Sequence, residues 1–289
     1  MSQATAVAVA DLTISTCGYD THLLRAGGGR ETAVLLLHGG GMGASAEANW
    51  MLTLPVLGEH FDVIAPDLLG FGETTHPEDP PLGPAAWLAL RVDQLVAILD
   101  AFGHERAVLV GNSLGGALTL ATTIRHPDRV EKIVLMGSAG PPFAPGPGLA
   151  RLLGFYDDPT HDNLTEILRS FVYDLDGFGD VDALVAGRLE NALRPEVRRS
   201  FDAMFASPDG TPTKVMGPPE EAVRGIRQPA LIVHGREDQI VPPEASLWLH
   251  ERIELADLAV LGRCGHWAML ERPDAFNRLV TDFIRTGEI

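Results

Sequence analysis

The chain has 289 residues, of which 45% are hydrophobic and 21% charged, the ordinary composition of a globular protein. Its formal net charge of -17 argues against nucleic acids and anionic membranes as partners, because both require a positive face. Two cysteines, Cys17 and Cys264, exclude a disulfide framework and a cysteine-rich zinc site. The sequence has no run of 18 apolar residues, and its start, MSQATAVAVA, lacks the basic region of a secretory signal. A cytoplasmic location is therefore expected.

Short apolar runs that end at a glycine or a turn predict the strands of a mostly parallel sheet. The stretch Leu12–Leu24 alternates loosely and predicts an antiparallel strand pair. The later runs are rich in Val, Ile and Leu, as strands buried on both faces are. They are Ala33–Leu37, Val63–Ala65, Ala107–Val110, Lys132–Met136, Ala230–Val233 and Leu258–Leu261. We expect a doubly wound α/β sheet with its functional site at the C-terminal ends of the strands.

Amphipathic helices are predicted between these runs. The clearest is Trp87–Phe102, and the residues expected on its apolar stripe are Leu88, Val92, Leu95, Val96 and Leu99. From residue 140 to 227 no convincing buried strand occurs; the region opens with GPPFAPGPG, contains three helical segments and ends with GTPTKVMGPPEE. We interpret 140–227 as a helical lid inserted into a core formed by 1–139 and 228–289. The alternative is a set of surface helices packed elsewhere.

A glycine-rich turn between a strand and a helix indicates a nucleophile. The string GNSLGG at 111–116 follows the run AVLV and precedes the helical stretch ALTLATTIRH. In that context the G-x-S-x-G pattern is typical of a nucleophile elbow, a strained turn that exposes the serine above the sheet. Ser113 is therefore the candidate nucleophile.

Serine needs a base, and the base needs an orienting acid. Among ten histidines, His266 follows the last predicted strand, at the sheet edge where Ser113 lies. His234 also ends a strand, where a structural histidine would be unremarkable. The chain order Ser, Asp, His selects Asp238, with Glu237 as its competing neighbour. Asp67 also follows a strand, but it precedes the serine and is interpreted as structural.

The loop HGGGMG at 38–43 supplies backbone N–H groups for a developing oxyanion. We expect the donors to be the N–H groups of Gly40 and of Leu114, the residue after the nucleophile. A phosphate-binding role for these glycines is weaker, since the motifs of phosphate loops are missing. No metal-ligand pattern is found, and Cys264 is expected to pack as a small apolar group.

These motifs together resemble the α/β-hydrolase fold, and more closely the meta-cleavage product hydrolases, which hydrolyse carbon–carbon bonds in bacterial aromatic degradation. The resemblance rests on HGGGMG with Asn49 eleven residues after the histidine, and on GNSLGG. It also rests on PDLLGFGET (66–74), GRLE (187–190), GREDQIVP (235–242), GRCGHW (262–267) and FNRLVTDFI (276–284). Met42 departs from the family, in which proline is frequent at that position.

The resemblance implies hydrolysis of the C5–C6 bond of 2-hydroxy-6-oxo-hexa-2,4-dienoates to a 2-hydroxypenta-2,4-dienoate and a carboxylic acid. It implies that Arg188 and Asn112 hold the carboxylate and 2-oxo end of the substrate, with Asn49 and Trp267 beside them. Gly39 and Gly41 are also placed at the substrate. Phe171, Ile240 and Val241 are implied to form an apolar subsite for the C6 substituent. The resemblance implies that no cofactor is needed. It also implies that the protein forms a homo-oligomer.

The implied mechanism leaves open whether water attacks directly or releases an acyl-enzyme. Haloalkane dehalogenases and epoxide hydrolases are disfavoured, because their nucleophile would be an aspartate where this chain has Ser113. A serine esterase or lactonase would share the three catalytic residues without needing Asn112 or Arg188. A ligand-binding receptor on the same scaffold is a more remote alternative.

Overall fold

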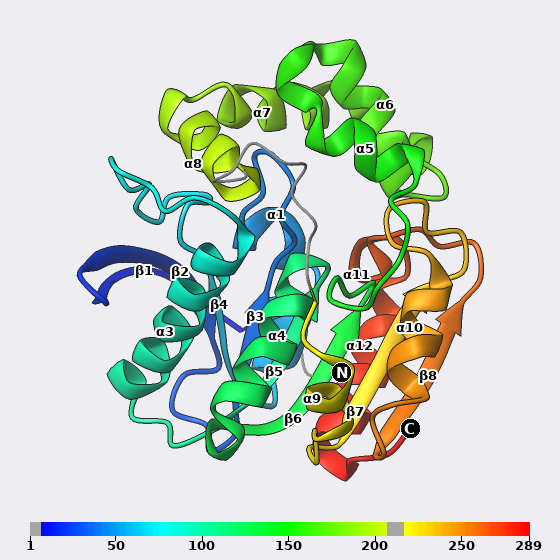
Figure 1. Ribbon diagram of the computed structural model, residues 1–289. Coiled ribbons are helices and arrows are strands. Elements are labelled where there is room, and N and C mark those ends of the chain that lie inside the picture. Colours follow the sequence, from blue (N-terminus) through cyan, green and yellow to red (C-terminus); the bar gives the residue numbers. More distant parts are fainter. Residues whose placement is uncertain (1–6, 207–216) are drawn as a thin grey trace, which may run out of the picture.

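The computed structural model describes residues 7–206 and 217–289, built around one eight-stranded sheet (Figure 1). The strands lie in the order β1-β2-β4-β3-β5-β6-β7-β8, and β2 pairs antiparallel with both β1 and β4. The remaining pairs are parallel. The strands are β1 Val9–Thr16, β2 Tyr19–Ala26, β3 Ala33–Leu37, β4 Asp62–Pro66, β5 Ala107–Asn112, β6 Val130–Met136, β7 Ala230–Gly235 and β8 Ala256–Leu261. The predicted α/β fold with a mostly parallel sheet is confirmed.

Helices cover both faces of the sheet because alternate side chains of each buried strand point to opposite sides. Val34 and Leu36 of β3 face one apolar core, whereas Leu35 and Leu37 face the other. The first core is closed by α1 Ala46–Trp50, α2 Leu54–Gly58, α11 Ala268–Glu271 and α12 Pro273–Thr286. The second is closed by α3 Pro84–Phe102, α4 Leu114–Arg125, α9 Glu220–Arg224 and α10 Pro243–His250.

The helix α3 forms as predicted, but its buried face differs from the expected stripe. Leu88 and Val96 are only half-buried. The buried face is wider and includes two polar residues; it consists of Trp87, Arg91, Val92, Gln94, Leu95, Ile98 and Leu99. Arg91 donates two hydrogen bonds to the carbonyl of Leu69, and Gln94 accepts one from the N–H of Leu69. Apolar periodicity misses this face because those polar side chains pair with the loop after β4.

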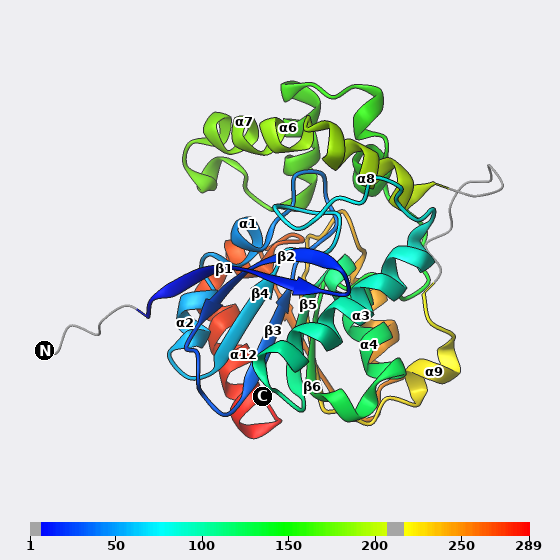
Figure 2. The same cartoon turned by 90° about the vertical axis from the view of Figure 1, so that its left-hand side faces the viewer.

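Four helices between β6 and β7 lie together over the end of the sheet where the parallel strands finish (Figures 1 and 2). They are α5 Pro147–Leu153, α6 His161–Phe171, α7 Val181–Ala192 and α8 Pro195–Phe205, and we call them the cap. Helix α9 lies instead beside the sheet, with Val223 buried in the second core. Part of the GTPTKVMGPPEE stretch falls outside the described residues. The division into a core of 1–139 and 228–289 and a lid of 140–227 stays a prediction.

Short single-turn 3-10 helices link the larger elements. They are η1 Pro127–Arg129, η2 Phe155–Asp157 and η3 Asp176–Phe178. Throughout residues 7–206 and 217–289, we find no helix both long and apolar enough to cross a membrane.

Asp67, interpreted above as structural, joins three parts of the fold. Its carboxylate accepts hydrogen bonds from the N–H of Ala46 at 2.6 Å and the N–H of Glu73 at 2.9 Å. The ring of His22 on β2 lies 2.8 Å from the same carboxylate. That hydrogen bond is the main cause that raises the pKa of His22 to about 9. The charged pair thus holds the N-terminus of α1 against the sheet.

We expect this pair to make stability depend on pH on the alkaline side. Because the pKa of His22 is raised on folding, the stabilisation is complete below about pH 6.5 and is lost as the pH rises through about 9. The free energy of unfolding should therefore fall between about pH 6 and pH 10 by about 1 to 2 kcal/mol more in the wild type than in His22→Gln. Denaturant titrations of both proteins measure this difference, and parallel pH curves would contradict it.

Candidate active site

The nucleophile candidate lies on a strained turn between β5 and α4. Ser113 has φ 54° and ψ -112°, a conformation that L-residues rarely adopt. Its N–H donates to the carbonyl of Met136 at 3.0 Å. A Cβ at Gly115 would lie 2.1 Å from the carbonyl oxygen of Leu37, so only glycine lets α4 approach β3 this closely. The turn leaves the Ser113 side chain half-buried, at the edge of the sheet.

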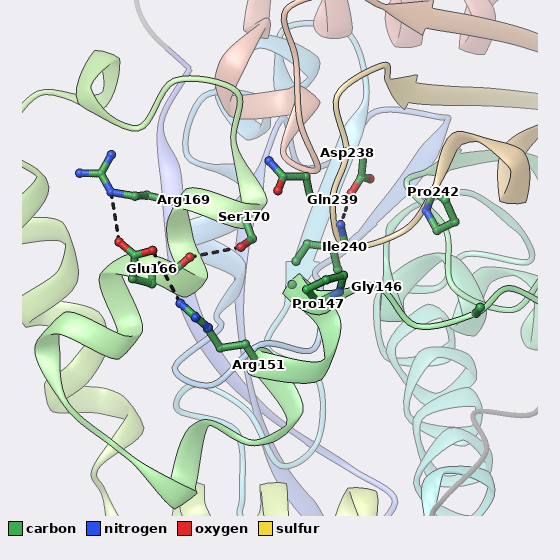
Figure 3. Close-up of a pocket in the computed structure, with 12 residues that line it drawn as sticks. Gly146, Pro147, Arg151, Glu166, Arg169, Ser170, Asp238, Gln239, Ile240 and Pro242 are labelled. Atoms are coloured by element: carbon green, nitrogen blue, oxygen red, sulfur yellow. Dashed lines mark hydrogen bonds and ion pairs between the residues drawn. The ribbon is translucent and has the colours of Figure 1, made fainter.

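His266 and Asp238 meet in the interior. The distance from His266 Nδ1 to Asp238 Oδ2 is 2.7 Å, and both side chains are fully shielded from water. The other oxygen of Asp238 accepts the N–H groups of Ile240 and Val241, and Figure 3 draws the first of these bonds. His266 Nε2 is buried and has no hydrogen-bond partner among the described residues. The ring therefore has one nitrogen fixed by a carboxylate and the other free to accept a proton.

The two competing side chains have other partners. His234 is fully buried, with Nδ1 2.6 Å from the Ser246 hydroxyl and Nε2 3.0 Å from the carbonyl of Val241. Burial lowers the pKa of His234, which keeps it neutral, although its Nε2 lies only 3.4 Å from Asp238. Glu237 pairs with Arg236 and accepts the N–H of Cys264, so it does not orient His266. The geometry favours Asp238 as the partner of the histidine.

The glycine loop after β3 lies against the elbow. A Cβ on Gly40 would lie 2.9 Å from the Leu114 side chain, and one on Gly39 would lie 3.5 Å from the Ser113 Cβ. The ring of His38 fixes the loop: Nδ1 donates to the carbonyl of Gly39 at 2.7 Å, and Nε2 accepts the N–H of Leu68 at 3.0 Å. Burial lowers the pKa of His38 to about 4, so the ring is neutral and can accept at Nε2.

The amide of Asn112 has protein partners at both ends, and both of its N–H groups are used. Its oxygen accepts from Nδ2 of Asn49 at 3.1 Å. Its nitrogen donates to the carbonyls of Met136 at 3.2 Å and of His266 at 3.4 Å. Asn112 thus connects the elbow, α1 and the loop that carries the histidine. To donate a hydrogen bond to a substrate, this amide must give up one of its two donated bonds.

Arg188 of α7 brings a positive charge from the cap to the glycine loop. Its Nε donates to the carbonyl of Met42 at 3.1 Å, and its guanidinium carbon lies 5.0 Å from the ring centre of Trp267. A Cβ on Gly41 would lie 3.5 Å from its Nη2. Burial lowers its pKa to about 10, which leaves it charged at neutral pH. In residues 7–206 and 217–289, we find no carboxylate in ion-pair contact with Arg188. The arrangement can receive an anion.

The three residues assigned to an apolar subsite are buried. The Phe171 ring lies 4.7 Å from the Trp267 ring and 5.3 Å from the His266 ring, measured between centroids. Ile240 lines a cavity of about 590 Å³ between the cap and the loop after β7, shown in Figure 3. Glu166 lies between Arg151 and Arg169 at its rim. Val241 is placed by its N–H bond to Asp238.

No cluster of three or more potential metal ligands occurs within the part of the chain that the structure describes. Cys264 is buried, and burial raises its pKa to about 12, so it is a protonated thiol that packs in the first core. Sequence patterns did not single out Glu271, which contacts the histidine loop. An acidic residue on a four-residue helix carries no signal of such a contact in its local sequence.

Comparisons with known proteins show what the whole chain is similar to. A family model described as the alpha/beta hydrolase fold matches residues 32–273. A 2-hydroxy-6-oxo-2,4-heptadienoate hydrolase of Pseudomonas putida is 40% identical over 267 residues, which cover 92% of this chain and 93% of the relative. A 2-hydroxymuconate semialdehyde hydrolase of another Pseudomonas is 40% identical over 275 residues, with 95% and 94% covered.

A solved structure gives the same result in three dimensions. The 2-hydroxy-6-oxo-6-phenylhexa-2,4-dienoate hydrolase from a Rhodococcus species superposes with a TM-score of 0.92 at 41% identity. The match covers 97% of this chain and 100% of that one. The similarity therefore includes the cap as well as the sheet.

We expect Asp238→Asn to remove most of the activity without unfolding the protein. The asparagine oxygen would keep the N–H groups of Ile240 and Val241, which places its NH₂ group against His266 Nδ1 and favours the wrong tautomer. In a serine protease the corresponding change lowers kcat about 10⁴-fold, and we expect a loss of at least about 100-fold here. Steady-state kinetics with an activated ester measure it. A variant with near wild-type kcat would exclude Asp238 as the orienting acid.

Proposed function

Because this chain belongs to the meta-cleavage product hydrolases of the α/β-hydrolase superfamily, we propose that Ser113, Asp238 and His266 are its catalytic triad. The proposal is supported by the strained turn at Ser113 and by the 2.7 Å contact between His266 and Asp238. The unpartnered Nε2 of His266 is the atom available to take the serine proton. The chain is a carbon–carbon bond hydrolase that acts on dienoates in aromatic degradation.

The observation that carries the substrate assignment is the Arg188 guanidinium without a carboxylate partner in the described structure. A charge removed from water is costly unless an anion compensates it, so an unpaired arginine at a glycine loop is suited to bind one. A 2-hydroxy-6-oxo-dienoate has a planar carboxylate beside its 2-oxo group, which an arginine can hold through two hydrogen bonds. Trp267 and Gly41 border the same place.

The reaction follows from this placement. The bound dienol is first ketonised, which makes C5 a leaving group that can accept an electron pair. His266 then takes a proton, from Ser113 or from water, and the oxygen attacks the C6 carbonyl. The oxyanion accepts the N–H groups of Gly40 and Leu114. The C5–C6 bond then breaks, and its electron pair passes through C4 and C3 to the 2-oxo oxygen, which takes up the proton held by His266. Hydrolysis leaves a 2-hydroxypenta-2,4-dienoate and a carboxylic acid, and no cofactor takes part in these steps.

Asn112 can donate to a substrate by exchanging one of its present hydrogen bonds. The longest of its bonds is the one to the carbonyl of His266, at 3.4 Å. We propose that the N–H group of Asn112 that makes this bond donates instead to an oxygen of the substrate. The Asn112 oxygen meanwhile continues to accept the hydrogen bond from Asn49. Gly39 lies against the side-chain oxygen of Asn112. Phe171, Ile240 and Val241 supply apolar surface for the C6 substituent. The named substrates of the three relatives differ in this substituent, so its identity is left to the assay.

An absorbance assay tests the function. Purified protein is given yellow ring-cleavage products with hydrogen, methyl, isopropyl or phenyl at C6, and p-nitrophenyl acetate in parallel. We expect rapid bleaching of at least one dienoate, and no bleaching by Ser113→Ala, which should still bind the dienoate. Fast ester cleavage with every dienoate left yellow would instead identify an esterase or lactonase. Stoichiometric binding without turnover would identify a receptor.

We expect Arg188→Gln to weaken dienoate binding selectively. Loss of a charge-assisted hydrogen bond, at about 1.5 to 3 kcal/mol, should raise KM for the dienoate about 10- to 100-fold. The KM for p-nitrophenyl acetate, which has no carboxylate, should change little. The matched control is Arg198→Gln on cap helix α8, whose arginine pairs with Asp202 at the surface. Equal losses for ester and dienoate would contradict the anion-binding role of Arg188.

We also propose that the enzyme is a homo-oligomer that acts in the cytoplasm. Support for the second point is indirect, from the bacterial catabolic enzymes to which the chain is similar. Light scattering after gel filtration measures the assembly, and a mass of about one chain would contradict it.

A further inference from the structure

The loop that carries His266 is fixed between the cap and the core. The N–H of His266 donates to the carbonyl of Phe171, the last residue of cap helix α6, at 2.6 Å. The N–H of Gly265 donates to Oε1 of Glu271 at 2.7 Å, and the N–H of Tyr173 donates to Oε2 of the same carboxylate at 2.7 Å. One oxygen of Glu271 thus holds the histidine loop and the other holds the chain leaving α6.

We propose that Glu271 is a positioning residue that couples cap helix α6 to the catalytic histidine. The proposal rests on the function assigned above, in which His266 is the general base. Glu271 lies five residues after His266, on the short helix α11, and belongs to the core. Its carboxylate therefore joins three parts of the structure: the core, the histidine loop and the segment that follows cap helix α6.

The packing around this carboxylate leaves little room for independent movement. A Cβ on Gly265 would lie 2.5 Å from the carbonyl oxygen of Phe171 and 2.9 Å from the Cα of Val172. The Phe171 ring also stands edge-on to the His266 ring, with 5.3 Å between centroids. A displacement of the α6 terminus would therefore push or pull the histidine backbone. Because misplacement of a catalytic group by about 1 Å can cost about 100-fold in rate, this coupling matters for turnover.

A second glutamate provides a natural comparison. Oε2 of Glu237 accepts the N–H of Cys264 at 3.0 Å, and the N–H of Glu237 donates to the carbonyl of Cys264 at 3.0 Å. Glu237 thus fixes the same loop one residue earlier. Within the part of the chain that the structure describes, the hydrogen bonds of Glu237 join it to the loop and to Arg236, and none joins it to the cap. Substitution of Glu237 loosens the loop at the core side alone.

The first experiment compares Glu271→Ala, Glu271→Gln and Glu237→Ala. We expect kcat of Glu271→Ala to fall about 10- to 100-fold with KM changed less than about threefold, since the base is displaced and the anion site is not. Glu271→Gln keeps one of the two acceptors and should recover part of the loss. Glu237→Ala should lose less than Glu271→Ala. An unchanged kcat in Glu271→Ala, or equal losses in Glu237→Ala, would overturn the proposal.

The second experiment isolates the cap contact and does not depend on Glu271→Ala being folded. Tyr173→Pro removes the N–H that donates to Glu271, and the extended Val172 before it (φ -126°, ψ 156°) suits the position before a proline. Tyr173→Ala keeps that N–H and is the matched control for the half-exposed side chain. We expect Tyr173→Pro to lower kcat about 10-fold and Tyr173→Ala to leave it nearly unchanged.

The double variant completes the test. If the bond between Tyr173 and Glu271 transmits the effect, Tyr173→Pro should add little to Glu271→Ala, which already lacks that bond, and the two losses should not multiply. Losses that multiply would overturn the coupling. All variants are measured with the dienoate and with p-nitrophenyl acetate. If only the ester is cleaved, the assignment of the substrate fails, while the ester kcat still decides the role of Glu271.

Discussion

The backbone of Ser113, held at φ 54° and ψ -112°, is the constraint on which the rest of the site depends. A strained turn persists only when its surroundings determine it, and here they do so from several sides. Met136 accepts its N–H, the glycine at 115 lets α4 pass against the carbonyl of Leu37, and Gly40 packs on Leu114. The same turn places the Asn112 amide where it can bond to the histidine loop. Ser113, the glycine loop and the loop that carries His266 are thus connected through one short segment.

The charge at the glycine loop is opposite in sign to the net charge of the whole chain. The protein carries a formal net charge of -17, yet the charge at the glycine loop is the positive charge of Arg188. Burial lowers the pKa of His38 in this loop to about 4, which keeps that ring neutral. Under the proposed function, a dienoate that enters from the acidic surface meets this one arginine of the cap. The contrast supports the proposal that an acidic protein binds an anionic substrate at this place.

Most of the fold could be predicted from the sequence, as could the close approach of Asp238 and His266, because the signals are local. The Val, Ile and Leu runs are local to each strand, and the elbow and histidine loop are short strings next to those strands. The misjudged stripe of α3 and the contact of Glu271 share a different property. Arg91 is buried against the carbonyl of Leu69, and Glu271 binds an N–H that is 98 residues away. When a side chain binds a backbone group of a distant segment, the local sequence around it shows no pattern that would predict the contact.

The position of the cap in the chain has a consequence for how this scaffold can be altered. The cap is inserted between β6 and β7, after Ser113 and before Asp238 and His266, the residues of the proposed triad. An exchange of the whole insertion would leave the order of the three catalytic residues intact, so the cap has the form of a replaceable module. The carbonyl of Phe171 limits that freedom, because it receives the N–H of His266. A transplanted cap in which α6 ends at another position would bring a new pocket, but it would lose the hydrogen bond that holds the backbone of His266.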